Sequence, residues 1–528
     1  MKNIALKLLA SAFAVSLLLS AVVPVASVNE HASTTVIRVA PPAPVFTDQQ
    51  RHQELAARRA RVAEAIGTKG TLILFSAEPR IYANDVHYYY RQENNLYYLT
   101  NMKQKGITLV MMPGNPLHPE ILFLRKRNAF AEQWNGRMYS AAEASRVSGI
   151  KEIWDASELG PFLRALKSKQ AYQPKPENVL MSASPGERSG SSGFETLFDA
   201  AGRNEADLYL LAAGQPEGPE YRQEFRAAAE WTQGTGYRVQ NASPIFASLR
   251  LRKSPMEIAL MQHAIDITNE ALQRAWIVAG SAKWEYEVDA EVIYTFKLRN
   301  ADHWGYPPIV GCGPNATILH YTESQSPLNP GDLLLMDVGA EYEHYTADVT
   351  RTFPVNGKFT SAQAEIYQIV YDAQEAAARA TRPGATISDV DRAATEVIKD
   401  GLLKLGLITD RGSSQHRLWF MHGTSHWLGM NVHDVGNYGS KLEPGMIFTN
   451  EPGIYISPEA LDNLPKTPET EKFIAAIRPA FEKYKGIGVR IEDDMLVIDG
   501  GVKWMTAALP RKASEIEAFI AKARNVRR

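Results

Sequence analysis

Two short stretches of this chain repeat one another, and each ends in an acidic residue after an apolar run. Residues 330–337 read Pro-Gly-Asp-Leu-Leu-Leu-Met-Asp, and residues 444–451 read Pro-Gly-Met-Ile-Phe-Thr-Asn-Glu. Asp337 and Glu451 therefore stand at the same distance from a Pro-Gly turn. A buried carboxylate is costly to leave without a partner, so acids at the ends of buried strands are rare. The repeat predicts that two strands bring carboxylates to a shared cation.

The repeat extends beyond these two strands. His320 and His433 precede the strands, and Asp348 and Glu492 follow them, so that each half has the order histidine, acid, acid. The helix-like stretches before the two halves also resemble each other. We therefore predict two related halves that face each other across one site.

Asp337 and Asp348 can belong to a single hairpin. If they are directly opposed, the turn centres between Tyr342 and Glu343, and opposed residues point to the same face of a sheet. Two carboxylates that close together raise each other's proton affinity, and a bound cation removes this conflict. The pair therefore favours a metal site over an isolated turn acid.

Strand alternation around Gly488–Glu492 predicts that Arg490 and Glu492 point to the same side. Two roles are open for Arg490. It can orient the carboxylate, as hydrogen-bond partners of metal ligands commonly do, or it can contact the substrate.

The segment Phe420–Gly429 contains two histidines, His422 and His426, at the four-residue spacing of the zinc-protease helix motif. That motif requires a glutamate where this chain has Gly423, and the sequence here is poor helix material. One of the two imidazoles can still bind a metal ion from a loop.

Four carboxylates with one imidazole form a set that suits Mn²⁺, Co²⁺, Fe²⁺ or Zn²⁺ and can hold two ions.

Composition restricts the partners and the remaining metal ligands. The chain has 57 Lys and Arg against 59 Asp and Glu, for a net charge of −2, and no long basic run. This balance disfavours nucleic acid as a partner and favours a small or peptide substrate. Cys312 is the single cysteine, which excludes an intrachain disulfide and a Cys-rich metal site.

The N-terminus predicts export. Lys2 and Lys7 precede an apolar run from Leu8 to Val23, which is typical of a secretory signal over residues 1–27. The run is too short to span a bilayer, which requires about 20 residues. We expect a flexible lead-in over residues 28–47, no stable membrane span after signal removal, and a periplasmic or extracellular location.

At 528 residues the chain is long enough for two domains. An N-terminal α/β domain is predicted over residues 48–250, and a mixed α+β domain over residues 255–528. Ser254, Pro255 and Glu257 form a capping box that predicts a helix start at this boundary. The further predicted helices are Gln50–Ile66, Ala141–Val147, a helix capped by Thr360, and Ser388–Leu405; the strands are Thr71–Phe75, Gly106–Met112 and Glu120–Leu124, and Ser182–Gly193 is a polar loop.

The acids and their surroundings resemble the metallopeptidases of the pita-bread fold (family M24), and within them bacterial aminopeptidase P. The resemblance covers about residues 255–500 and implies a C-terminal pita-bread domain. The N-terminal region of the chain also resembles the amino-terminal domain of that family, but more weakly. The motifs are Tyr306-Pro307, residues 318–323, 348–353, 425–429 and 432–436, together with Tyr90-Arg91-Gln92 and Trp134-Asn135-Gly136-Arg137.

This resemblance implies a role for each candidate residue. It implies Asp337, Asp348, His426, Glu451 and Glu492 as ligands of two divalent ions, with Mn²⁺ expected and Co²⁺, Zn²⁺ or Fe²⁺ as alternatives. His320 and His433 are implied as catalytic groups, and Glu451 as the acceptor of the proton from water. His422 and Arg490 are expected to contact the substrate, and Trp134 to close a neighbour's site in a homo-oligomer, a dimer or tetramer.

The implied activity is removal of one residue from peptides whose second residue is proline. A prolidase that acts only on Xaa-Pro dipeptides is the alternative enzyme on the same fold. A peptide-binding protein without activity is the alternative from another class.

Overall fold

The computed structural model of the chain describes residues 36–183, 193–211, 222–231 and 234–526. Residues 1–27, for which the signal is predicted, and most of the polar loop 182–193 lie outside these ranges. Residues 37–528 form one compact unit. The boundary between residues 250 and 255 therefore stays a prediction from the sequence.

A seven-stranded mixed sheet occupies the first half, in the order β7-β6-β5-β4-β1-β8-β9. Strand β1 pairs in parallel with β8 and antiparallel with β4. The strands are β1 (Gly70–Phe75), β4 (Thr108–Met111), β5 (Glu120–Leu124), β6 (Ile153–Asp155), β7 (Val179–Met181), β8 (Ala206–Leu210) and β9 (Tyr237–Asn241), and β2 (Ile81–Ala83) with β3 (Val86–His87) forms a separate hairpin.

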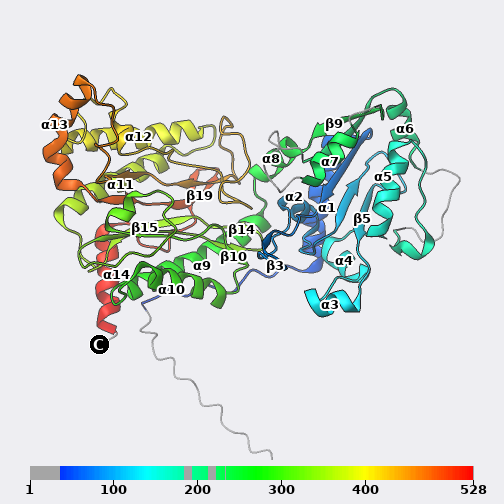
Figure 1. The fold of residues 1–528 in the computed structure, drawn as a ribbon, viewed down its shortest axis with the longest axis horizontal. Helices are drawn as coiled ribbons and strands as arrows, with labels where there is room; N and C mark the ends of the chain where they lie inside the picture. The colour runs from blue at the N-terminus through cyan, green and yellow to red at the C-terminus, as the bar shows by residue number, and fades with distance from the viewer. Residues whose placement is uncertain (1–35, 184–192, 212–221, 232–233, 527–528) are drawn as a thin grey trace, which may run out of the picture. The chain divides into compact units, whose positions relative to one another are not determined.

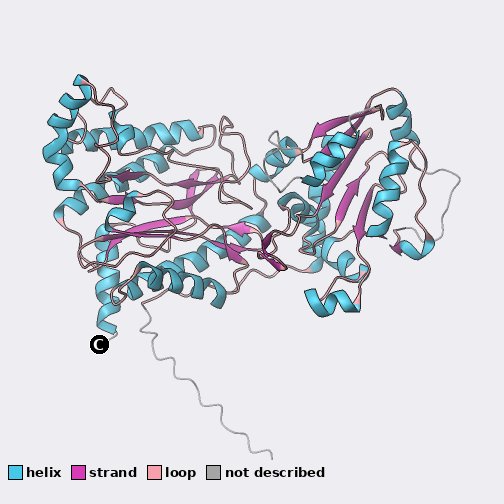
Figure 2. Cartoon of the chain, in the orientation of Figure 1, coloured by secondary structure: helices cyan, strands magenta, loops and turns pink. Residues whose placement is uncertain are grey.

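Helices cover both faces of this sheet, because successive side chains of a buried strand point to opposite sides. Leu72 and Leu74 join the core beneath α1 (Asp48–Ile66), α2 (Asn94–Thr100) and α4 (Ala141–Ser148). Ile73 and Phe75 join a second core with α5 (Leu159–Lys167), α6 (Glu195–Gly202) and α7 (Arg222–Trp231). The α/β character predicted for this half is confirmed, as Figure 2 shows. Helices α3 (Ala129–Asn135) and α8 (Ser243–Leu251) complete it.

Short sheets and long helices build the second half. Figure 1 shows strands such as β15 and β19 between the helix pair α9–α10 and the pair α11–α12. The sheets are β10-β13-β14, β11-β12-β15, β16-β19-β20 and β17-β18. The helices are α9 (Pro255–Ala279), α10 (Glu285–Leu298), α11 (Ser361–Ala380), α12 (Ile387–Leu405), α13 (Pro468–Tyr484) and α14 (Ala513–Val526); the strands are β10 (His303–Trp304), β11 (Ile309–Cys312), β12 (Leu333–Val338), β13 (Ala340–Tyr342), β14 (Tyr345–Thr346), β15 (Val349–Pro354), β16 (Ile447–Asn450), β17 (Gly453–Tyr455), β18 (Gly488–Arg490), β19 (Asp493–Ile498) and β20 (Gly501–Trp504).

Capping boxes begin the helices where the sequence predicts them. The side chain of Ser254 accepts from the backbone N–H of Glu257 at the start of α9, and Thr360 does the same with Gln363 at α11. Helix α12 begins one residue earlier than predicted, because Thr386 forms the cap. These side chains satisfy backbone donors that the first helical turn leaves without partners.

The expected flexible lead-in over residues 28–47 is wrong for its described end. The backbone N–H of Arg38 donates to Gln273 at 2.7 Å, and that of Ala40 donates to Glu270 at 2.8 Å, so this segment is fastened to α9. The sequence shows no motif for these contacts, because they join residues more than two hundred positions apart. None of the described helices combines the length and the apolar run that crossing a bilayer requires.

Candidate metal and substrate site

One cavity of about 560 Å³ in the second half collects most of the candidate residues. This size suits a small peptide, since pockets for small ligands span about 300–1,000 Å³. The predicted residues among those that line it are Asp337, Asp348, His426, Glu451, Glu492, His320, His422, His433 and Arg490.

A tyrosine joins the two aspartates. Asp337 lies near the end of β12, and Asp348 lies just before β15. The hydroxyl of Tyr306 is 2.5 Å from Oδ1 of each aspartate. Both carboxylates therefore point to one spot, where burial and the two negative charges raise the pKa of Tyr306 well above its usual value.

The predicted direct opposition of Asp337 and Asp348 is wrong. Asp337 pairs with Thr350, and the turn is centred between Glu343 and His344. Both turn residues have positive φ, 46° and 68°, the backbone conformation of a tight hairpin turn. Since the register differs by two residues, the side-chain faces are unchanged, and the aspartates still meet as diagonal neighbours.

The second of the two sequence repeats contributes an imidazole and a glutamate to the same spot. Nε2 of His426 lies 3.2 Å from Oδ2 of Asp348 and 3.4 Å from Oε1 of Glu451, which follows β16. Nδ1 of His426 lies 3.2 Å from the carbonyl oxygen of Trp427. A proton on Nδ1 would complete that hydrogen bond and leave Nε2 free as a ligand atom.

Glu492 and Arg490 close the cluster from β18 and the residues just after it. Oε2 of Glu492 accepts a hydrogen bond from the hydroxyl of Thr350 at 2.6 Å. Nη2 of Arg490 is 2.5 Å from Oδ2 of Asp337, while its Nε is 3.9 Å from Glu492. Arg490 is almost fully buried, and its contacts match the first of its two predicted roles, orientation of carboxylates.

Three further histidines surround the acids at the cavity wall. Nε2 of His422 is 2.8 Å from the hydroxyl of Tyr455, which also accepts a hydrogen bond from Nη1 of Arg490 at 2.8 Å. The ring of His433 stands nearly perpendicular to that of His426, with centroids 4.4 Å apart. His320 is exposed and lines the same cavity from a loop.

Burial and mutual repulsion disfavour the ionised acids. Burial, with the charge of Asp337, raises the pKa of Asp348 to about 6, and burial raises the pKa of Glu451 to about 7 and that of Glu492 well above its usual value. Burial alone would lower the pKa of His426, but its bond to Asp348 and the charge of Glu451 raise it to about 9. The cluster therefore favours any positive charge that can enter it.

A divalent metal ion fits this donor set. One ligand atom each of Asp348, His426 and Glu492 lies within 4.8 Å of the other two. Asp337 and Glu451 add carboxylate oxygens to the same cavity. Carboxylates with an imidazole and a cavity that opens to substrate are typical of a catalytic metal site rather than a closed structural one.

Cys312 and Trp134 lie apart from the cluster. Cys312 is buried, and burial raises the pKa of its thiol to about 12, so the thiol packs as a neutral group in the interior. Trp134, on α3, is 75% exposed, so it is not a core tryptophan, and it does not line the cavity of its own chain.

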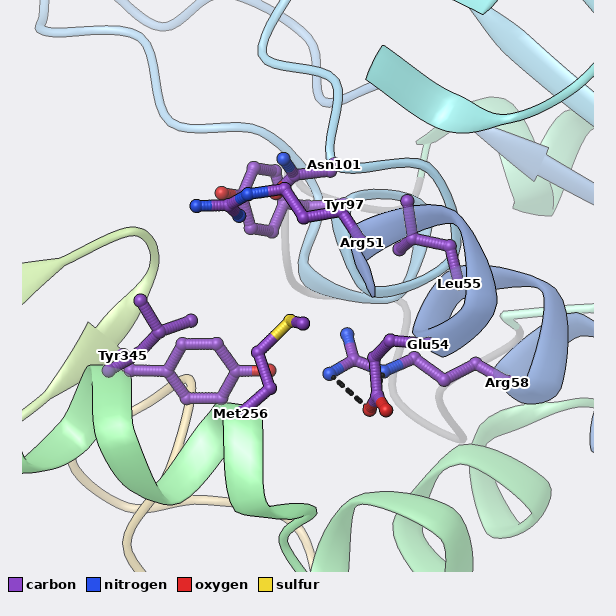
Figure 3. A pocket seen from close by; sticks show the side chains of 9 residues that line it. Arg51, Glu54, Leu55, Arg58, Tyr97, Asn101, Met256 and Tyr345 are labelled. Atoms are coloured by element: carbon purple, nitrogen blue, oxygen red, sulfur yellow. Dashed lines mark hydrogen bonds and ion pairs between the residues drawn. The ribbon is translucent and has the colours of Figure 1, made fainter. Parts of the chain in front are cut away.

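A second, much smaller cavity of about 20 Å³ lies among α1, α2, α9 and β14 (Figure 3). Arg58 and Glu54 form an ion pair at 2.9 Å on its wall. The volume is enough for about one water molecule. This cavity contains none of the candidate residues and is too small for a peptide.

Sequence reasoning missed several groups that hold the cluster. Tyr306 and Thr350 lie within motifs that carry the resemblance but had no predicted role, and Tyr455 had no signal beyond its strand. Asp494 is fully buried and accepts a hydrogen bond from the backbone N–H of Asp348 at 3.2 Å. These residues become recognisable only when segments distant in sequence meet.

Comparison with known proteins agrees with this geometry. The model of Metallopeptidase family M24 matches residues 259–499, and the model of the aminopeptidase P N-terminal domain matches residues 55–173. Xaa-Pro aminopeptidase of Escherichia coli is 35% identical, over 89% of this chain and 98% of the relative. The corresponding enzyme of Haemophilus influenzae is 34% identical, over 88% and 96%.

A solved structure, aminopeptidase P from E. coli with the inhibitor Pro-Leu, superposes with a TM-score of 0.74 at 32% identity. The match covers 91% of this chain and all of that one. The predicted fold class, an N-terminal α/β domain followed by a pita-bread domain, is thereby confirmed. Relatives that align along nearly their full length, in both parts of the architecture, place this chain in the aminopeptidase P group of metallopeptidase family M24.

Proposed function

We propose that this chain is a metalloaminopeptidase that hydrolyses the bond between an N-terminal residue and a following proline. The observation that carries the proposal is the convergence of Asp337, Asp348, His426, Glu451 and Glu492 at one peptide-sized cavity. Relatives that carry the name Xaa-Pro aminopeptidase support the substrate class.

The five converging residues would hold two divalent cations, for which Mn²⁺ is our first candidate and Co²⁺, Zn²⁺ and Fe²⁺ are alternatives. When bound, such ions supply Lewis acidity, which polarises the scissile carbonyl and lowers the pKa of the attacking water. Elemental analysis of the purified protein should find about two ions per chain. A metal-free, inactive protein would instead favour the peptide-binding alternative.

The residues of the chain divide the proton transfers between them. Glu451 lies at the cluster with a pKa of about 7, which suits a group that takes a proton from water near neutral pH. His320 and His433 line the same cavity. They can stabilise the developing negative charge on the carbonyl oxygen or donate a proton to the proline nitrogen.

Selectivity for proline has a physical reason. A bond to proline lacks the amide hydrogen, and the ring fixes φ, so a site that relies on that hydrogen or on an extended chain handles it poorly. Here the free amine of the substrate can lie against the carboxylates, which limits cleavage to a single residue. His422 and His433 lie where they can surround the ring, while Arg490 is held by Asp337.

Three peptide types test the activity in the presence of Mn²⁺, Co²⁺ or Zn²⁺. We expect release of the first residue from Xaa-Pro-Yaa and longer peptides, with little cleavage of Xaa-Ala-Yaa. Cleavage of Xaa-Pro alone would identify a prolidase. Equal rates on Xaa-Pro-Yaa and Xaa-Ala-Yaa would reject the proline requirement.

We also propose that the chain works as a homo-oligomer in which Trp134 closes a neighbour's site. Its support is the exposure of Trp134 and Phe130, 75% and 71%, on one helix. Trp134→Ala is expected to raise KM for tripeptides about tenfold, because a buried interface aromatic contributes on this scale, with unchanged melting temperature.

The control is Tyr294→Ala, which removes another exposed aromatic, on α10. Sedimentation should show an assembly of two or four chains for the parent. A fully active monomer, or the same KM in Trp134→Ala, would contradict this role.

Export is the last part of the proposal and has only the sequence of residues 1–27 as support. Fractionation of cells that express the full chain, followed by N-terminal sequencing of the mature protein, tests it. Retention in the cytoplasm with Met1 or Lys2 at the N-terminus would contradict it.

A further inference from the structure

A buried glutamate outside the cavity is bonded to one loop of the catalytic half. Glu285 is the first residue of α10 and is fully buried. Its Oε1 accepts hydrogen bonds from the backbone N–H of Cys312 at 2.7 Å and from Nδ2 of Asn315 at 3.0 Å. Its Oε2 accepts from the hydroxyl of Tyr321 at 2.8 Å and from the backbone N–H of Ser326 at 2.9 Å. Four donors from one segment thus converge on one carboxylate.

All four donors are neutral groups, so the carboxylate depends on every one of them. Hydrogen bonds to an ionised acceptor are shorter and stronger than those between neutral groups. Removing a buried acceptor leaves its donors unpaired at the full cost of their desolvation. Glu285 therefore fixes the ends and the middle of the loop 312–326 at once.

This loop carries His320. The neighbouring Tyr321 is buried in an apolar cluster with Ile309 and Leu335. His320 lines the cavity, and in the part of the chain that the structure describes no hydrogen bond holds its imidazole there. The position of that ring is therefore set by its backbone, which Glu285 holds through Tyr321.

The loop also rests directly on a strand of the site. The carbonyl oxygen of Ala316 lies 2.0 Å from where a Cβ at Gly488 would stand, so only glycine permits this approach. Gly488 begins β18, which carries Arg490. The loop thus packs between α10 on one side and β18 on the other.

A similar arrangement occurs in the second of the two sequence repeats, the one that contains Glu451. Oδ1 of Asp391, on α12, accepts hydrogen bonds from both the backbone N–H and the hydroxyl of Thr424, each at 3.0 Å. Thr424 lies in the loop between His422 and His426. In each half, an acid on a helix holds the loop that presents histidine to the cavity.

We propose that Glu285 is a positioning residue that holds His320 at the cavity by fastening the loop 312–326. This inference rests on the proposed function, because His320 is assigned a proton-transfer or charge-stabilising role there. Glu285 touches neither substrate nor metal ligands in this role, and acts only through the loop.

The variant Glu285→Gln tests the proposal first without any activity measurement. An amide places its NH₂ group opposite two donors, and one of the two is in either orientation a backbone N–H that cannot accept, so at least one hydrogen bond is lost. Cys312, the only cysteine, is buried at one end of the loop and serves as the probe. We expect its reaction with a thiol reagent in the native state to become about tenfold faster than in the parent, since local opening exposes it. An unchanged rate would overturn the fastening role.

The second measurement is a double-mutant cycle with His320→Ala, at saturating metal and with metal content verified. Glu285→Gln alone is expected to lower kcat about 10- to 100-fold, with KM changed less than about twofold. In the His320→Ala background it should change kcat less than about twofold, because its effect passes through His320. Equal losses in both backgrounds would overturn the proposal.

Two further variants separate positioning from general stability. Tyr321→Phe removes one donor only and should give a smaller kcat loss that also disappears in the His320→Ala background; it replaces Glu285→Gln if that variant does not fold. Glu270→Gln is the matched control. Glu270 is as buried as Glu285, but its partners Arg299 and Ala40 lie outside the loop 312–326. It should leave kcat and the reactivity of Cys312 unchanged. An inactive parent protein would reject the proposed function, while the thiol reaction would still decide whether Glu285 holds the loop.

Discussion

Glu451→Gln is expected to reduce kcat by about a thousandfold or more, with the fold intact. The substitution removes the group assigned to take the proton from water and one of the charges that attract the cations, and general-base catalysis alone contributes about 10²–10⁴-fold. Asp337→Asn should have a similar effect, because it removes a charge at the point where Tyr306 and Arg490 converge. Turnover on Xaa-Pro-Yaa, metal content and circular dichroism are measured together.

The matched control is Glu443→Gln. Glu443 precedes β16, the strand that Glu451 follows, and its side chain is 51% exposed. It should retain full activity and metal content. Near-normal turnover with full metal content in Glu451→Gln or Asp337→Asn would reject the two-metal assignment.

Removal of metal is expected to abolish activity and to make stability depend on pH in a defined direction. The folded chain has pKa values of about 6 at Asp348 and about 7 at Glu451, above their usual values of 3.8 and 4.5. A folded state that binds protons more tightly than the unfolded state is stabilised at low pH. This stabilisation is fully present below about pH 4 and is lost as the pH rises through about 6 to 7.

Divalent cations should replace those protons. We therefore expect the melting temperature of the chelator-treated protein to fall between about pH 5 and pH 8, and Mn²⁺ to raise it by about 5 °C or more at pH 8 but much less at pH 5. Differential scanning calorimetry with and without Mn²⁺ measures both. His426, whose pKa is raised to about 9, extends the same trend to higher pH. A metal effect that is equal at both pH values would contradict the assignment of these acids.

The sequence by itself predicted which acids come together in the cluster and which segments carry them. The matched spacing of Asp337 and Glu451 after Pro-Gly turns, and the histidine and acid that flank each strand, are short-range patterns that survive without coordinates. Helix starts at Ser254 and Thr360 were predictable for the same reason, since a cap involves residues three positions apart. In these cases the physical cause and the signal lie within the same few residues.

Tertiary structure alone decided how the groups meet. The hairpin register depended on the left-handed backbone conformation of Glu343 and His344. Glutamate and histidine are not residue types that predict such a turn. The phenol of Tyr306 between two aspartates, the contact of Arg490 with Asp337, and the four donors on Glu285 join residues that lie 27 to 153 positions apart in the chain. No local propensity encodes a contact of that kind, because it arises only when separate strands and loops pack together and a buried polar group must find whichever partner lies beside it.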